Sequence, residues 1–563
     1  MVVLNKESLL LRRVLKVIFY FAVFWFLIGF VFLPMLNTVF SSFETDSGMN
    51  FGNYIEFFKN PNSFQIVKQT FIMGLFTAII CGLIGTALAF YMSFVKVKNK
   101  KLINALLLSP MMVPGLIIVI AFIQLYGESG IITKALQCIF NLSEVPYNFN
   151  GLSGILFVHA CTQYTYFYLN TSIALKYVDY STIEAARGIG ASKIKILFTI
   201  IIPSIAPALL SSAIVTFISG IGSFSAPNLI GGGYRVLTTQ IVRSKANNFM
   251  NIASLQVVIL LIMGLSVMMI IQYYEKKYTF ESSVRNVPIE AKEIKNPALR
   301  YILKILLTII LLVIILPIAG IIFLSFAEKG SMMVEIFPKE FTFDNYIKIF
   351  STARVLKPFI NSITMSFITV IVLLVITLPL SYFLAKNKTK YNSVVLFLAM
   401  LPWAMPVSTI GINLINSFNV KNIFSFNTSL IGTFWILPLA YIIISLPLMI
   451  RTNKIAMESF NISLEHASRS LGAGPVKTFI SITAPVVMPA IISSAALVFI
   501  RTIGEYTCSA LLYGIYNRPI SIAMVSSMQE YDIELSMAYG TLTILVCLMA
   551  MFIIMKFDKE KTI

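Results

Sequence analysis

Long apolar runs alternate with short polar or basic stretches along the whole chain. Each run has about 20 residues, enough to cross the hydrocarbon layer of a bilayer as a helix, in which the backbone satisfies its own hydrogen bonds. The pattern therefore predicts an all-α polytopic membrane protein with about 12 transmembrane helices. The predicted spans lie near residues 17–40, 67–94, 102–125, 152–175, 199–224, 252–273, 301–326, 359–384, 393–415, 430–450, 479–503 and 538–555.

Lysine-rich loops indicate which ends of these spans face inward, because cytoplasmic loops carry an excess of Lys and Arg. Two such loops follow the second and eighth spans, at residues 96–101 and 386–390, and the first 16 residues are basic as well. We therefore expect both termini of this multi-pass protein to be cytoplasmic. The first apolar run is too long for the core of a signal peptide and is interpreted as a retained span.

Composition supports the membrane assignment. The chain is 58% hydrophobic and 12% charged, whereas soluble domains have about 45–50% apolar and about 25% charged residues. The formal net charge of +19 follows from inside loops and does not indicate a nucleic-acid partner. The five cysteines are scattered, mostly in apolar runs, and the only histidines are His159 and His466. These features predict no metal site.

The second half of the chain repeats the plan of the first. Pro110 and Pro114 correspond to Pro402 and Pro406, and the segment at 51–55 resembles that at 343–347. Matching positions six spans apart face the same side of the membrane, so the repeats are parallel rather than inverted. The expected organisation is a first six-helix half at residues 1–273, a charged cytoplasmic linker at 274–300, and a second six-helix half at 301–563.

The clearest repeat lies on the predicted inside, between the fourth and fifth spans of each half. The stretch starting at Ile183 aligns without a gap with the stretch starting at Glu465, and the identical pairs include Arg187 and Arg469, Gly190 and Gly472, Lys195 and Lys477, Pro203 and Pro485, and Pro207 and Pro489. We expect Glu184–Ile189 to form a short helix with Glu184 near its positive end. Gly190 should end it in a left-handed turn.

These loops, at residues 183–203 and 465–485, resemble the "EAA" loop of ABC-importer permeases. In the first half the matching residues are Glu184, Ala185, Ala186, Gly190, Ile200, Ile202 and Pro203. The second half matches less closely, with Glu465, His466, Ala467, Ser468, Gly472 and Pro485. The whole chain resembles the fused, double-length permeases of ferric-iron-type importers, which have thiamine, aminoalkylphosphonate and polyamine relatives.

The resemblance implies a type I importer fold in a bacterial cytoplasmic (inner) membrane, alternating access, and coupling to a separate ATPase through two cytoplasmic helices. The residues expected to contact that ATPase are Glu184, Ala185, Ala186, Arg187, Gly190, Glu465, His466, Ala467, Ser468, Arg469 and Gly472. The partners implied are a cytoplasmic ABC ATPase dimer, an extracytoplasmic substrate-binding protein and the lipid bilayer. The sequence contains no Gly-x-x-x-x-Gly-Lys-Ser/Thr motif, so ATP and Mg²⁺ are expected on the partner and no catalysis on this chain.

Polar side chains within the spans are candidates for the translocation pathway, because ionisable groups there tend to face a cavity. Arg501 and Glu505 stand four residues apart, where they could pair, and their counterparts in the first half are Ser219 and Ser223. The fourth span adds Gln163, Tyr164 and Asn170. A structural ion pair and interhelical hydrogen bonding are the respective alternatives. The segments 222–233 and 504–514 are candidates for an outer gate or a binding-protein contact.

Two classes of function remain open from sequence. One is the permease of an ATP-driven importer, with ferric iron as the expected substrate and thiamine, aminoalkylphosphonate or polyamine as alternatives. The other is an ion-coupled secondary transporter. The second class predicts carboxylates inside the spans, and the spans contain almost none beyond Glu505. The importer is therefore favoured.

Overall fold

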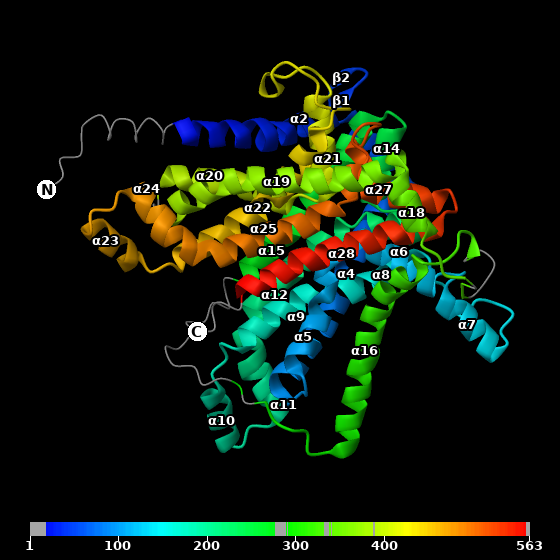
Figure 1. The fold of residues 1–563 in the computed structure, drawn as a ribbon, viewed down its shortest axis with the longest axis vertical. Coiled ribbons are helices and arrows are strands. Elements are labelled where there is room, and N and C mark those ends of the chain that lie inside the picture. The colour runs from blue at the N-terminus through cyan, green and yellow to red at the C-terminus, as the bar shows by residue number, and fades with distance from the viewer. Residues whose placement is uncertain are drawn as a thin grey trace.

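The structure is a computed structural model that describes residues 18–275, 289, 291–331, 337–338, 340–386 and 389–558. Within these ranges it is almost entirely helical (Figure 1). Ten helices are long and apolar enough to cross a membrane, and a further pair, Lys390–Ala404 and Val407–Phe418, is bent by 111°. The strands described are β1 (Glu44–Thr45) and β2 (Gly48–Met49), a small antiparallel hairpin.

The first half begins with a helix described from Ile18, which passes through the π-turn η1 and ends with α2 at Ser42. In order, the helical elements of the first half are η1 (Ile28–Phe32), α2 (Leu33–Ser42), α3 (Gly52–Lys59), α4 (Pro61–Phe94), α5 (Lys100–Leu108), η2 (Ser109–Met112), α6 (Gly115–Tyr126), α7 (Ile131–Phe140), α8 (Gly151–Thr162), α9 (Tyr164–Leu175), α10 (Tyr180–Gly188), α11 (Lys193–Ile196), η3 (Leu197–Ile201), α12 (Ile202–Ile221), α13 (Ser225–Ile230), α14 (Leu237–Ala246) and α15 (Met250–Glu275).

The second half repeats this order with few differences. Its elements are α16 (Pro297–Leu324), α18 (Asp344–Ser351), α19 (Ala353–Lys386), α20 (Lys390–Ala404), α21 (Val407–Phe418), η5 (Ile423–Ser425), α22 (Ile436–Glu458), α23 (Ile462–Ser470), α24 (Pro475–Thr478), η6 (Phe479–Thr483), α25 (Ala484–Ile503), α26 (Thr507–Leu512), α27 (Ile520–Gln529) and α28 (Ile533–Asp558). Among the described residues, no α-helix lies between α21 and α22, where the first half has α7.

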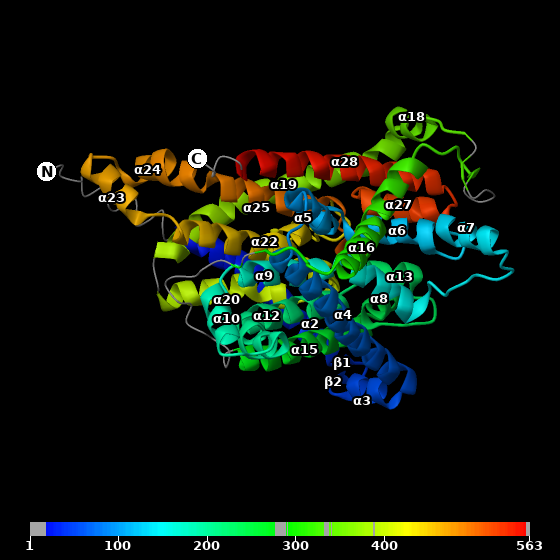
Figure 2. The ribbon, with the colours of Figure 1, turned by 90° about the horizontal axis from the view of Figure 1, so that it is seen from below.

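The two halves interlock through their first helices (Figures 1 and 2). The N-terminal helix contributes Val23, Leu27 and Val31 to a core cluster that is otherwise rich in second-half residues such as Val395 and Phe418. The first helix of the second half, α16, packs in turn against α6 of the first half. Two apolar clusters therefore contain residues of both halves and hold the halves together.

Three predicted spans are interrupted helices, and their interruptions coincide with special residues. The predicted third span consists of α5, the 3-10 turn η2 and α6, and Pro110 and Pro114 lie at the breaks. Its counterpart in the second half bends between α20 and α21, just before Pro406. Proline removes a backbone donor and disfavours helix at the preceding residue. The predicted fourth span is likewise divided at Gln163 into α8 and α9, of 12 residues each.

The end of the predicted linker is held to the first half. Residues 276–288 and 290 lie outside the described residues. Lys292 pairs with the end of α4, where its N–H donates to the Phe94 carbonyl at 2.9 Å and its own carbonyl accepts from Lys96 at 3.2 Å. Lys96 also forms an ion pair with Glu293 at 3.3 Å. The described part of the linker is therefore ordered by contact with the basic loop after α4.

Candidate functional site

The duplicated loops fold into two matched short helices, α10 and α23, at separate places on one end of the molecule (Figures 1 and 2). Each begins at an Asx cap: the Asp179 carboxylate accepts from the Ser181 N–H, and the Asn461 amide oxygen accepts from the Ser463 N–H, both at 3.0 Å. Such caps satisfy donors that a helix start leaves free. The helix starts four residues before Glu184, so the prediction that Glu184 lies near its positive end is wrong.

Both helices end in the same glycine turn, as predicted for Gly190. Gly190 has φ +82° and Gly472 has φ +83°. The N–H of Gly190 bonds to the Arg187 carbonyl at 2.9 Å, and the next N–H bonds back to Ala186 at 3.0 Å. The second half repeats this pattern with matching bonds to Arg469 and Ser468. These are the two bonds of a Schellman cap, which needs a left-handed residue and therefore favours glycine.

From Ser181 and Ser463 onward the two helices present the same exposure pattern, although Tyr180 is buried and its counterpart Ile462 is exposed. The exposed predicted contact residues are Glu184, Ala185, Arg187, Gly190, His466, Ala467, Arg469 and Gly472, while Ala186 and Ser468 are half-buried. Sequence reasoning missed one matched pair: Ile189 is 87% exposed and Leu471 is 90% exposed, each directly before the glycine turn. Their signal in the sequence is an apolar residue at the same place in both copies of an otherwise polar loop.

Glu465 does not belong to this exposed surface, because only 1% of the residue is accessible. Its carboxylate forms an ion pair with Lys386 at the end of α19, accepts from the Thr483 hydroxyl at 3.1 Å and lies 3.5 Å from Arg469. Lys386 is itself held over the Tyr382 ring at 4.1 Å. Glu465 therefore fixes α23 to two neighbouring helices, and its predicted place among the contact residues is corrected to that of an anchor.

The first half anchors its helix with an apolar side chain at the position of Glu465. Ile183, which aligns with Glu465, is 0% exposed. It belongs to the same apolar cluster as Phe94 and Ile201, the counterparts of Lys386 and Thr483. A second support comes from Tyr180, whose hydroxyl accepts from Arg187 at 3.2 Å and whose ring lies 5.4 Å from the Lys292 ammonium. The same mechanical attachment is thus ionic in one half and apolar in the other.

A π-turn joins each of these helices to the following span. The turns η3 and η6 occupy matched positions, directly before the helices in which Pro203 and Pro485 are the second residues. A π-turn accommodates a proline, which has no backbone N–H to donate to the hydrogen bonds of the helix. Such turns are frequent at functional sites. The position between a short surface helix and a long spanning helix suits a hinge.

At the opposite ends of α12 and α25 the two halves touch through symmetric contacts. A Cβ placed on Gly222 would lie 3.2 Å from the Pro406 Cβ, and one placed on Gly504 would lie 2.3 Å from the Pro114 Cβ. The rings of Phe224 and Tyr506, which align with each other, stack at 5.2 Å. We call these six residues the inter-half contact. It is carried by the predicted gate segments 222–233 and 504–514, whose short helices α13 and α26 are mostly buried.

The pathway candidates Arg501 and Glu505 are not paired with each other. Arg501 is exposed in the last turn of α25. Glu505 accepts from the backbone N–H groups of Cys508 at 2.9 Å and Ser509 at 3.0 Å, which caps the start of α26. No ion pair found in the described part of the chain joins the two, so the predicted pairing is wrong.

The first-half counterparts take part in a different polar contact. The Ser223 hydroxyl lies 2.9 Å from Nε2 of buried His159, and Nδ1 of the same ring lies 2.8 Å from the Thr77 hydroxyl. This chain of contacts joins the turn after α12 to α8 and α4. Ser219 is half-buried on α12. The structure therefore places Ser223 and Glu505 directly beneath the inter-half contact, each stabilising its own half.

The candidates of the predicted fourth span bond to neighbouring helices. The Asn170 amide donates to the Ser212 hydroxyl at 2.9 Å, which joins α9 to α12. The Tyr164 hydroxyl donates to the Leu107 carbonyl of α5. The amide oxygen of Gln163 is buried at the α8–α9 break and has no hydrogen-bond partner. The first two fit the interhelical alternative, while Gln163 keeps a free acceptor.

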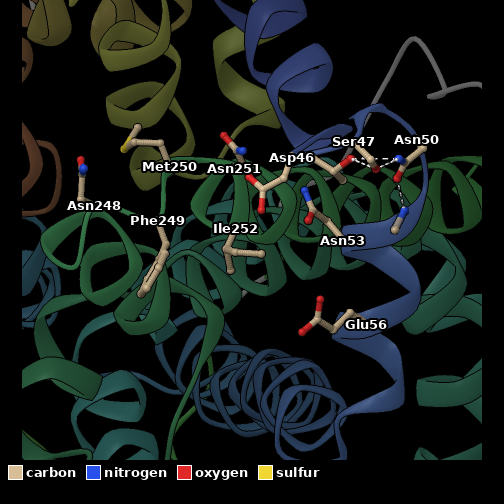
Figure 3. Close-up of a pocket in the computed structure, with 12 residues that line it drawn as sticks. Asp46, Ser47, Asn50, Asn53, Glu56, Asn248, Phe249, Met250, Asn251 and Ile252 are labelled. Carbon is tan, nitrogen blue, oxygen red and sulfur yellow. Dashed lines mark hydrogen bonds between the residues drawn. The ribbon is translucent and has the colours of Figure 1, made fainter.

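A polar recess of about 480 Å³ opens near the hairpin end of the first half (Figure 3). The polar side chains in its lining are Thr45, Asp46, Ser47, Asn50, Asn53, Glu56, Asn248 and Asn251. In the second half, Lys348 takes the place of Glu56 and forms an ion pair with Asp532 at 2.6 Å. The two halves thus differ in charge on this face. Within the described ranges, no group of three His, Cys, Asp or Glu side chains could hold a metal ion.

Comparison with known proteins gives related sequences for the whole chain. The ABC transporter permease protein y4fN of Sinorhizobium fredii, described as probable, is 29% identical over 92% of this chain and 92% of its own length. The ferric transport system permease protein FbpB of Actinobacillus pleuropneumoniae is 23% identical over 88% of this chain and 71% of its own length. The spermidine/putrescine permease PotB of Haemophilus influenzae is 28% identical, over 40% of this chain and 80% of its own length.

A family model, the binding-protein-dependent transport system inner membrane component, matches the chain twice, at residues 102–279 and 377–560. The first match includes α10 and the second includes α23, so each copy carries one of the two matched surface helices. Members of this family are transport components rather than catalytic enzymes. Because the two matches together cover more than half of the residues, one in each half, this chain belongs to the family of ABC-transporter permeases as a fused double copy.

Proposed function

We propose that this chain forms the translocation pathway of an ATP-driven importer and is coupled to a separate ATPase dimer through α10 and α23. The observation that carries the proposal is the matched pair of capped helices, each followed directly by a large apolar side chain that is almost fully exposed, Ile189 or Leu471. A large apolar side chain left in water is typical of an interaction surface. Two such helices on separate halves fit two copies of a soluble partner.

The geometry supports alternating access. The halves meet at Gly222, Gly504 and the stacked rings, while α10 and α23 lie apart at the other end of the molecule (Figure 1). An ATPase dimer that closes on ATP draws the two helices together, and the π-turns transmit this movement to α12 and α25. The inter-half contact at the far end of these spans then separates, which opens the pathway toward an extracytoplasmic binding protein.

Ferric iron is the proposed cargo, because ferric-transport permeases are among the relatives that align along most of the chain. The test is ATP-dependent uptake of radioactive ferric iron by proteoliposomes that contain this chain, its ATPase and its binding protein. Uptake of iron, and none of a polyamine, supports the proposal.

Polyamine is the second candidate, because the PotB and PotC relatives match single halves of the chain at 28% identity. If the same assay shows uptake of spermidine and no uptake of iron, the proposed cargo becomes a polyamine, while the proposed ATP-driven mechanism is unaffected. Uptake driven by an ion gradient with no ATPase present would contradict the mechanism itself.

Substituting the two exposed apolar residues is expected to weaken binding of the ATPase. Burying one Ile or Leu side chain contributes about 1.5–3 kcal/mol. Ile189→Glu or Leu471→Glu should therefore raise the dissociation constant for the ATPase by roughly 10- to 150-fold each. The measurement is a binding titration of purified permease in nanodiscs with the ATPase.

The matched control is Phe426→Glu, because Phe426 is 91% exposed in the segment between η5 and α22. This variant carries the same new charge far from α10 and α23, and its affinity for the ATPase should equal that of the unmodified chain. An equal loss of affinity in the control would show that added charge, rather than the two helices, governs the interaction.

A further inference from the structure

Two short helices at the outer ends of α4 and α19 share an unusual surface. In α3 and the residue before it, Phe51, Ile55 and Phe58 are 65%, 54% and 47% exposed. The matched positions at α18 are Phe343, Ile347 and Phe350, which are 66%, 60% and 56% exposed. The spacing i, i+4, i+7 places each trio on one face of its helix. Both halves therefore present a largely exposed apolar face, in which Phe51 touches Phe43 at one edge and Phe343 touches Phe326.

The opposite faces of these helices are held by the protein, which fixes their orientation. Phe57 and Ile349 are buried in the core. The Tyr54 hydroxyl bonds to Ser42 at 2.8 Å, and the Tyr346 hydroxyl bonds to Ser325 at 2.6 Å. The apolar trios consequently cannot turn inward without breaking these contacts.

The remaining side of each helix is polar. Asn53 and Glu56 of α3 face the recess of the first half (Figure 3). On α18, Lys348 points to Asp532, and Asp344 is exposed. Each helix thus has three sides, of which one is packed on the protein, one is polar and one is apolar and open. A helix with separate polar and apolar open sides suits a boundary between water and hydrocarbon.

The open apolar side continues directly onto the membrane-spanning surface. A single residue, Asn60, separates α3 from α4, whose exposed side chains include Phe64, Phe71 and Leu75. Next to α18, the exposed residues of α19 include Ile360, Phe367 and Ile371. In a multi-pass membrane protein these side chains face lipid. The two helices lie on opposite flanks of the molecule, away from the inter-half contact (Figure 2).

We propose that α3 and α18 lie in the outer headgroup region of the bilayer with their apolar trios inserted toward the acyl chains. Their partner is lipid rather than the binding protein, because the apolar face continues the lipid-facing surface of α4 and α19. The two helices hold the outer ends of α4 and α19 at a fixed depth, one on each flank, while the halves move. This inference concerns the membrane position of the chain and is independent of its cargo.

The test places a spin label at each trio and compares its collisions with oxygen, which concentrates in lipid, and with a water-soluble nickel chelate. The labelled variants are Ile55→Cys, Phe58→Cys, Ile347→Cys and Phe350→Cys, in a Cys138→Ser chain because Cys138 is exposed. The matched controls are Glu56→Cys and Asp344→Cys on the polar sides of the same helices. Oxygen should exceed the chelate several-fold at the four apolar positions, and the order should reverse at the controls.

A second measurement needs no label. Phe58→Trp and Phe350→Trp should be quenched by lipids brominated near the headgroup, and added binding protein should leave this quenching unchanged. The proposal is overturned if the apolar positions collide more with the chelate than with oxygen. It is equally overturned if the binding protein, rather than brominated lipid, shields the introduced tryptophans.

Discussion

Glu465→Ile is expected to destabilise the protein and abolish ATP-driven transport. The substitution removes the carboxylate partner of Lys386 and leaves that ammonium beside the Tyr382 ring at the end of α19. Breaking a buried pair from one side costs about 3–5 kcal/mol. We expect about 3 kcal/mol here, the low end of that range, because a quarter of the Lys386 side chain is exposed. The measurements are thermal unfolding of the purified chain and uptake by the reconstituted importer.

The matched control copies the first half of the same chain. There the three positions are Phe94, Ile183 and Ile201, which pack in one apolar cluster. The triple variant Lys386→Phe, Glu465→Ile, Thr483→Ile should therefore recover most of the stability that the single substitution loses, since replacing a buried pair by packed apolar groups is often neutral. A triple variant no more stable than Glu465→Ile would show that the two anchors are not equivalent.

The difference between these anchors shows where sequence reasoning ends. The alignment of Ile183 with Glu465 is visible in the sequence, and so is the loop they share. The partner of Glu465 lies 79 residues away in α19, and only the fold brings Lys386 beside it. For this reason a carboxylate in a cytoplasmic loop was expected on the surface, whereas the structure buries it.

Features of the fold that depend on residues close together in the sequence could be predicted from it. Hydropathy located most of the spans, although the described residues contain ten helices long and apolar enough to cross a membrane and one bent pair rather than about 12. The need for a left-handed residue predicted the glycine turn at Gly190, which Gly472 repeats. Hydropathy did not reveal the breaks at Gln163 or the 111° bend before Pro406, because an average over a window is insensitive to one missing hydrogen bond. The exposure of Ile189 could not be predicted from the sequence either, because an apolar residue is expected in the protein interior unless its three-dimensional surroundings are known.

Gly504→Ala is expected to uncouple ATP hydrolysis from transport. The added Cβ would lie 2.3 Å from the Pro114 Cβ and 2.5 Å from its Cγ, so the two halves cannot keep their present contact. Overpacking of this kind costs about 1–3 kcal/mol. The cost falls on the arrangement in which the halves touch, and it shifts the population toward separated halves by roughly 5- to 150-fold. ATP hydrolysis without binding protein should rise, and uptake per ATP should fall.

Two glycines provide graded controls for this prediction. Gly222→Ala meets its symmetric partner Pro406 at 3.2 Å, which a small shift can relieve, so its effect should be weaker. Gly233→Ala meets nothing within 4 Å and should behave like the unmodified chain. A general loss of stability would lower hydrolysis and uptake together, whereas separation of the halves raises the first and lowers the second. The order Gly504, Gly222, Gly233 in binding-protein-independent hydrolysis therefore tests the inter-half contact as the outer gate, and equal values for all three variants would contradict it.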